Sequence, residues 1–358
     1  MNHKSSINWI SNKDIDNNIV NELMKIPLKT NQFTNNGVNV NFLEEFIKEK
    51  FKIDNNKSVI VVTNGSVAIH ALVSGISYYE EIKINWVTQS FTFPPSAQSN
   101  LSKVKIIDID EDGGMDIKKV DNTVNGLIVT NIFGNIVDID KYETFCRENN
   151  KFLIFDNAAT GYTEYNGKNC LNYGNGCTIS FHHTKPFGFG EGGAIIVDKK
   201  YEKNIRCLNN FGIGLTDKYW VPEGNNNKMS EISAIYILQY LKRNLDTIIN
   251  KHNELYLYFQ EQMVKHKITH FKLFPSFHDG LIVPSCFCIL FDNYDDNIRV
   301  KLLENNIQAR KYYHPLDDSK VANEIFDKIL CIPCNIHMDW SDIDKIFSIF
   351  KLFFICIG

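Results

Sequence analysis

Residues 180–193 carry the most distinctive chemistry of the chain, because Lys185 lies there in a glycine-rich turn just beyond a predicted strand. Apolar residues flank the lysine, so we expect it to be shielded from water. Shielding lowers the pKa of an ammonium group, and the free amine that results can form a Schiff base. Most lysines are solvated surface charges, so Lys185 alone does not establish this chemistry.

Three glycines of the same turn, Gly188, Gly190 and Gly193, match the spacing of the dinucleotide-binding fingerprint. That fingerprint must follow a strand and open a helix. Here the glycines precede residues 194–197, an apolar run typical of a strand. The context is wrong for a dinucleotide, and a nicotinamide oxidoreductase is therefore disfavoured.

Asp156 ends an apolar run at residues 151–155 and is followed by the small residues Ala158 and Ala159. A carboxylate in this place can hold a pyridinium nitrogen protonated, which is what makes pyridoxal phosphate (PLP) an electron acceptor. For an isolated aspartate, a helix N-cap or a turn is the simpler interpretation.

A turn at residues 63–66 connects a predicted strand to a predicted helix and contains Gly65 and Ser66. Backbone N–H groups at that helix N-terminus, with the Ser66 hydroxyl, would suit a phosphate. An ordinary serine N-cap explains the same residues about as well.

The elements that must position these residues alternate between short β-branched runs and longer amphipathic stretches from about residue 57. This alternation predicts an α/β fold with a mainly parallel sheet and helices on both faces. Such sheets bind ligands at the carboxyl ends of their strands, where Gly65, Asp156 and Ser180 are expected. The predicted strands cover residues 58–62, 82–87, 104–108, 126–130, 151–156, 178–181 and 194–198, with helices at 66–77 and 138–149.

The pattern changes from about residue 230, where a long predicted helix (residues 230–265) leads into a smaller α/β region. Strands are predicted in that region at residues 286–291 and 329–332. We therefore expect a large domain at residues 1–240 and a small C-terminal domain at residues 241–358, since 358 residues exceed one typical domain.

Several stretches, in the same order along the chain, resemble the DegT/StrS family of sugar-nucleotide aminotransferases over roughly residues 27–345. The resemblance implies the PLP-dependent transferase fold type I of aspartate aminotransferase, with a mainly parallel seven-stranded sheet and a smaller C-terminal α/β domain. The similar stretches are residues 35–37 with 42–46, 64–70, 90–93, 180–193, 226–231 and 307–316, together with Asp156.

The resemblance implies a role for each matching residue. Lys185 would form the Schiff base with PLP, Asp156 would bind the pyridine nitrogen, and Phe93 would stack on the cofactor ring. Asn226 would reach the phosphate bound by the neighbouring subunit, which implies a homodimer with shared active sites. The other cofactor-binding residues would be Gly65, Ser66 and Ser180, and the substrate-side candidates are His183, Tyr312 and His314.

The resemblance also implies a reaction. L-glutamate would convert the PLP enzyme to its pyridoxamine phosphate form, which would then aminate a keto sugar carried on a nucleotide. The motifs around Asp156 and Lys185 are most similar to those of enzymes that convert a UDP- or dTDP-linked 4-keto-6-deoxy sugar to the 4-amino-4,6-dideoxy sugar. A 3-keto sugar aminotransferase, a PLP-dependent sugar dehydratase and a catalytically silent binding protein are the alternatives. Dehydratases of this kind replace the lysine with histidine, and Lys185 argues against that class.

Three residues depart from the family pattern. Ala159 stands where a histidine or glutamine is usual, so contacts to the ring hydroxyl of the cofactor do not carry over. Ser66 replaces a threonine and Lys228 replaces an arginine, and both changes keep the chemical character of the side chain.

Composition argues against several other classes. The formal net charge of −4 gives no basic surface for nucleic acid. The N-terminal segment lacks the apolar core of a signal peptide, and the most apolar stretch, near the C-terminus, contains Lys351 and is too short for a membrane span. Nine irregularly spaced cysteines indicate reduced thiols in a cytoplasmic protein. Cys331 and Cys334 have zinc spacing but no second pair, so no metal site is expected.

Overall fold

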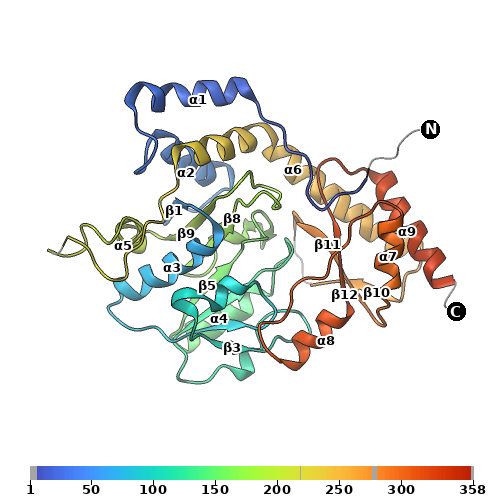
Figure 1. Ribbon diagram of the computed structural model, residues 1–358. Coiled ribbons are helices and arrows are strands. Elements are labelled where there is room, and N and C mark those ends of the chain that lie inside the picture. The colour runs from blue at the N-terminus through green and yellow to red at the C-terminus, as the bar shows by residue number, and fades with distance from the viewer. Residues whose placement is uncertain (1–5, 218, 276–279, 356–358) are drawn as a thin grey trace.

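The computed structural model describes residues 6–217, 219–275 and 280–355. A large unit is built on a seven-stranded sheet and a smaller unit on a three-stranded sheet, and the long helix α6 (Glu231–Lys265) extends along both (Figure 1). The first described residues lie beside the small unit, where Ile7 forms a parallel bridge with Ile307.

The large sheet has the strand order β1-β9-β8-β5-β4-β2-β3. Neighbouring strands from β8 to β3 are parallel, whereas β9 lies antiparallel between β1 and β8. The prediction of a mainly parallel seven-stranded sheet is therefore confirmed. The strands are β1 (Lys57–Val62), β2 (Trp86–Gln89), β3 (Lys105–Ile107), β4 (Gly126–Thr130), β5 (Phe152–Asp156), β8 (Gly176–Ser180) and β9 (Gly193–Asp198).

Helices cover both faces of this sheet. Successive strand residues point to opposite faces, so each face carries apolar side chains that a helix layer can bury. In β1, Ile60 and Val62 pack with α3 and α5, whereas Val59 and Val61 pack in the layer that contains α2, α4 and the first half of α6. A short hairpin, β6 (Glu164–Tyr165) and β7 (Lys168–Asn169), follows β5. The helices of this unit are α1 (Asn17–Thr30), α2 (Val38–Lys50), α3 (Gly65–Tyr79), α4 (Ile139–Glu148) and α5 (Glu202–Leu208).

The small unit has an antiparallel sheet in the order β10-β11-β12. On β11, Phe287 and Ile289 pack against the second half of α6 and α9, whereas Cys286 and Cys288 face the large unit. The elements are β10 (Phe271–Leu273), β11 (Cys286–Phe291), α7 (Asn297–Glu304), α8 (Lys320–Lys328), β12 (Ile329–Pro333) and α9 (Trp340–Ile355).

One strand boundary differs from expectation. The strand predicted to start at residue 82 begins at Trp86, because α3 continues to Tyr79 and Glu81 takes a positive φ of 55° that turns the chain. The proposed domain boundary near residue 240 falls inside α6, which contributes Tyr240 to the core of the large unit and Leu255 to the core of the small unit. The division at that residue stays a prediction.

None of the helices in the described residues has the length and hydropathy needed to cross a bilayer.

Candidate active site

Three strand ends meet at one edge of the large sheet. Asp156 and Ser180 are the last residues of the parallel neighbours β5 and β8, so they lie at the same edge. β1 runs in the direction of β8 because β9 pairs antiparallel with both. The turn at residues 63–66 therefore reaches the same edge, which is where sheets of this kind bind ligands.

Asp156 is buried, and both of its carboxylate oxygens accept hydrogen bonds. Oδ1 accepts from the N–H of Ala158 at 3.0 Å and from the Thr178 hydroxyl at 3.3 Å, and Oδ2 accepts from the Ser96 hydroxyl at 3.3 Å. Within the described chain it has no direct ion-pair partner. Burial raises the pKa of Asp156, and the hydrogen bonds and the charge of Lys185 oppose this increase.

Lys185 lies in a tightly closed turn between β8 and β9. Its N–H donates to the carbonyl oxygen of His182 at 2.8 Å, and its own carbonyl accepts from the N–H of Gly188 at 3.1 Å. A Cβ at Gly188 would lie 2.0 Å from the His182 carbonyl oxygen, so only glycine lets this turn close. Burial lowers the pKa of the Lys185 ammonium, and Asp156 and Cys286 oppose this decrease. The lysine therefore has the environment that favours a free amine.

The turn at residues 63–66 packs closely on the ends of β8 and β9. Asn64 caps α3 by accepting from the N–H of Val67 at 3.0 Å. A Cβ at Gly65 would lie 2.9 Å from Ser180 Cβ, and one at Gly193 would lie 2.5 Å from the carbonyl oxygen of Asn64. These glycines let the three backbones approach one another. The described chain supplies no acceptor for the N–H groups of Gly65 and Ser66, the first two residues of the helix.

This set of groups fits PLP. A buried carboxylate without a cation suits a protonated pyridine nitrogen, and an amine with a lowered pKa suits the aldehyde. Two unpaired N–H groups at a helix N-terminus suit the phosphate. All three lie at one edge of one sheet, where the strand pattern predicted Gly65, Asp156 and Ser180.

Phe93 borders this edge beside the 3₁₀ helix η1 (Pro94–Ala97), which carries Ser96 to Asp156. Phe93 is 54% exposed, and its ring centroid lies 6.0 Å from that of Tyr313. A largely exposed aromatic ring in this place can stack on a planar cofactor.

Residues 310–317 join the small unit to this part of the large unit. The N–H of Leu316 donates to the Ser90 carbonyl at 2.9 Å, and the Ser90 hydroxyl donates to Asp317 at 2.6 Å. Tyr313 is buried and stacks on Phe133 with ring centroids 4.9 Å apart. The small unit therefore forms one wall of the site.

The substrate-side candidates are spread more widely than the cofactor-binding set. His183 accepts from the N–H of Gly190 at 3.3 Å, inside the Lys185 turn. The Tyr312 hydroxyl accepts from Arg310 at 3.0 Å, and the exposed His314 packs on Phe326 at 4.1 Å. Of the two adjacent tyrosines, the one that packs on Phe93 is Tyr313, which the sequence did not single out.

Asn226 is exposed and bridges to Asn210, next to the backbone that contacts the phosphate turn. The N–H of Thr63 donates to the carbonyl oxygen of Asn227 at 3.0 Å. The exposed amide of Asn226 is therefore presented at the surface, as a contact to a second subunit would require.

Four further residues surround the site. Thr178 lies two residues before Ser180 on the same strand face, so the period of a strand would have found it. Ser96 follows the aromatic segment at residues 90–93, but nothing in the sequence points it toward Asp156. Cys286 and Lys13 come from distant segments and reach the Lys185 turn only through the tertiary fold.

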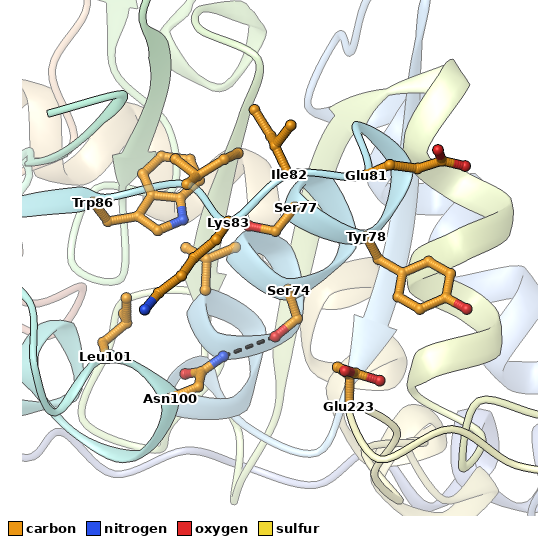
Figure 2. Close-up of a pocket in the computed structure, with 12 residues that line it drawn as sticks. Ser74, Ser77, Tyr78, Glu81, Ile82, Lys83, Trp86, Asn100, Leu101 and Glu223 are labelled. Atoms are coloured by element: carbon orange, nitrogen blue, oxygen red, sulfur yellow. Dashed lines mark hydrogen bonds between the residues drawn. The ribbon is translucent and has the colours of Figure 1, made fainter. Parts of the chain in front are cut away.

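A surface groove of about 520 Å³ lies away from these residues, at the C-terminal end of α3. Figure 2 shows its lining side chains, which include Trp86 and Glu223, with Asn100 donating to the Ser74 hydroxyl at 2.8 Å. At 1.5 Å per helical residue the groove is roughly 15 Å from the N-terminus of α3. It is therefore separate from the chemistry at Lys185.

The cysteine pair with zinc spacing is divided between two environments. The Cys331 sulfur lies 3.9 Å from that of Cys288, and the Cys334 sulfur lies 3.7 Å from Nδ1 of His252. The described residues contain no group of three or more His, Cys, Asp or Glu side chains arranged to hold a metal ion.

Comparison with known proteins identifies the family of the chain. Residues 13–351 match the model of the DegT/DnrJ/EryC1/StrS aminotransferase family. The dTDP-4-amino-4,6-dideoxy-D-glucose transaminase of Shigella dysenteriae is 25% identical, over 91% of this chain and 93% of its own length. The UDP-4-amino-4,6-dideoxy-N-acetyl-beta-L-altrosamine transaminase of Campylobacter jejuni (strain 81-176) is also 25% identical, over 95% and 97%.

The fold of the chain also resembles that of solved aminotransferases. The Helicobacter pylori aminotransferase PseC, involved in the biosynthesis of pseudoaminic acid, superposes with a TM-score of 0.81 at 18% identity, over 97% of this chain and 99% of its own. The predicted fold type I of PLP-dependent transferases is confirmed by this likeness. The chain therefore belongs to the DegT/DnrJ/EryC1/StrS aminotransferase family and is a PLP-dependent sugar aminotransferase.

Proposed function

We propose that this enzyme transfers the amino group of L-glutamate to carbon 4 of a 4-keto-6-deoxy sugar carried on UDP or dTDP. The observation that carries the aminotransferase chemistry is the placement of Lys185, partly buried and with a pKa lowered by burial, at the sheet edge where the buried Asp156 has no ion-pair partner. Support for carbon 4 comes from the Shigella and Campylobacter relatives, whose names specify 4-amino-4,6-dideoxy sugars on dTDP and UDP.

In this proposal PLP supplies a conjugated ring that takes up the electron pair left when the amino donor loses its α-proton. Lys185 would hold the cofactor through its aldehyde and would, as a free amine, remove the α-proton of the donor. Asp156 would keep a proton on the ring nitrogen, and Thr178 and Ser96 orient its carboxylate. Gly65 and Ser66 would bind the phosphate through their N–H groups, and Phe93 would exclude water from one face of the ring.

We also propose that the active site is shared between two subunits. Asn226 is exposed near the phosphate turn, and several large apolar side chains of the preceding segment are exposed as well: Phe211 at 47%, Tyr219 at 78% and Trp220 at 58%. Exposed apolar patches of this kind mark interaction surfaces. We propose that a second copy of the chain covers them and brings its own Asn226 to the site.

The test is an assay of the purified holoenzyme with L-glutamate and four keto sugars, the 4-keto-6-deoxy and 3-keto-6-deoxy sugars on dTDP and on UDP. NMR of the product identifies the aminated carbon. Amination at carbon 4 is expected, and turnover of the 3-keto sugars alone would establish the alternative regiochemistry. Loss of the sugar hydroxyl at carbon 3, without amino transfer, would instead identify a dehydratase.

A further inference from the structure

Lys13, in the segment before α1, reaches into the Lys185 turn. Its ammonium donates to the carbonyl oxygen of Lys185 at 2.7 Å and also to the carbonyl oxygen of Gly188. It lies 4.8 Å from the ring centroid of Tyr240, a residue of α6. The Tyr240 hydroxyl in turn donates to the carbonyl oxygen of Pro186 at 3.3 Å. Two side chains from two distant segments thus bind three carbonyl groups of one turn.

Lys13 is partly buried and has no compensating carboxylate. In the described residues it forms no ion pair, and only backbone carbonyls and the Tyr240 ring contact its ammonium. Burial lowers its pKa to about 7. A buried lysine without a counter-ion costs stability, so a purely structural role would be better filled by an apolar side chain.

We propose that Lys13 and Tyr240 are positioning residues that hold the turn carrying Lys185 in its reactive geometry. The hydrogen bonds at His182, Lys185 and Gly188 are internal to the turn. Phe187 and Phe189 anchor the turn by packing against Phe51 and Tyr236. Lys13 and Tyr240 add hydrogen bonds to its carbonyl groups from outside the turn. Hydrogen bonds from a charged donor fix such carbonyls more strongly than neutral ones do. A misplacement of about 1 Å at a reacting group can cost about 100-fold in rate. This inference rests on the proposed role of Lys185.

The charge of Lys13 also acts on its neighbours. It lowers the pKa of His183, in addition to the effect of burial, and contributes to the lowering of the pKa of His252 to about 4. Removing a positive charge raises the pKa of nearby basic nitrogens. The titratable or charged groups around Lys13 are His183 and Lys185 from the turn, and Tyr240 and His252 from α6.

The test compares Lys13→Met, which keeps the length and removes the donor, with Lys13→Arg, which keeps charge and donors. Three quantities are measured on each holoenzyme: the melting temperature, the stopped-flow rate of the half-reaction with L-glutamate, and the pH midpoint of the absorption change of lysine-bound PLP. We expect K13M to slow the half-reaction by roughly 10-fold or more. The spectroscopic midpoint should move to higher pH, and K13R should restore both values to near wild type.

Tyr240→Phe provides an independent variant that removes only the bond to Pro186. It should slow the half-reaction by roughly 3-fold, without moving the midpoint, since no charge is lost. If K13M does not fold, Lys13→Gln, whose neutral and shorter amide reaches one carbonyl at most, is measured in the same way.

A folded K13M or K13Q enzyme whose rate and midpoint both equal those of the wild type would overturn the inference. If the melting temperature of that variant is lowered, Lys13 is a structural residue only. A wild-type enzyme that shows no absorption from lysine-bound PLP would overturn the proposed role of Lys185 itself, which is a distinct failure.

Discussion

Thr178 lies opposite Asp156 in the register of β8 and β5, and its hydroxyl donates to Asp156 Oδ1 at 3.3 Å. Through Thr178, strand β8 therefore orients the Asp156 carboxylate at the end of β5. Replacement of Thr178 by valine keeps the shape and removes the donor. Because one neutral hydrogen bond is lost, we expect kcat to fall by about 3- to 10-fold. Thr178→Ser keeps the hydroxyl and should stay close to wild type in a steady-state assay; equal kcat values for both variants would contradict the role.

Lys185→Ala removes the amine that binds PLP and moves the α-proton. We expect turnover to fall by about 1,000-fold or more, because the amine that moves the proton is lost. The absorption spectrum should lose the band of lysine-bound PLP. The exposed Lys203→Ala is the matched control, since it also removes one lysine and should retain wild-type rate and spectrum.

Asp156→Asn should have opposite effects on activity and on the stability of the apoenzyme. The amide cannot hold the ring nitrogen protonated, so kcat should fall by roughly 100-fold or more. The apoenzyme should become more stable at neutral pH, because a buried carboxylate without a cation costs free energy that a neutral amide avoids.

The pH dependence of the stability gain of D156N follows from the direction of the Asp156 pKa shift. The pKa of Asp156 is raised in the folded chain, so folding favours its protonated form. The cost of the buried charge is absent below the unfolded pKa, about 3.9 for aspartate, and grows as the pH rises through the higher folded pKa. Thermal unfolding of both apoenzymes should therefore show the stability gain of D156N shrinking toward low pH. A gain that stays constant with pH would exclude Asp156 as its source.

Gly193→Ala tests the close approach of β9 to the phosphate turn. The added Cβ would lie 2.5 Å from the carbonyl oxygen of Asn64, so the turn at residues 63–66 must shift. We expect a weaker affinity for PLP and a loss of about 1–3 kcal/mol in the free energy of unfolding. Titration of the apoenzyme with PLP, followed by fluorescence, measures the affinity, and an unchanged Kd would show that the turn does not bind the phosphate.

A mixed dimer tests whether Asn226 serves the site of the other subunit. Asn226→Ala and Lys185→Ala are each expected to be nearly inactive alone. After unfolding and refolding together, half of the randomly formed dimers would be mixed, and each would contain one intact site, giving about a quarter of wild-type activity. Activity that stays at the level of the separate variants would place Asn226 in the site of its own subunit.

The motifs and the hydrophobic periodicity of the sequence determined the sheet and the residues at its carboxyl edge. The alternation of β-branched runs with amphipathic stretches predicted the sheet, because both faces of a parallel sheet must be covered by helices. The placement of Asp156, Ser180 and Gly65 at one edge followed from strand direction alone. The apolar surroundings of Lys185 predicted a lowered pKa for its ammonium, and burial in the structure shifts that pKa in the same direction.

Only the tertiary structure decided which side chains complete the site. Lys13 reaches its carbonyl partners across 172 residues of sequence, and Ser96 reaches Asp156 across 60. No local pattern encodes such contacts, because they depend on how layers pack rather than on the period of one element. The packing of layers also places Tyr313, rather than the neighbouring Tyr312, against Phe93. The sequence thus determines which groups exist at the strand ends, whereas the packing of segments around that edge selects the groups that hold them in place.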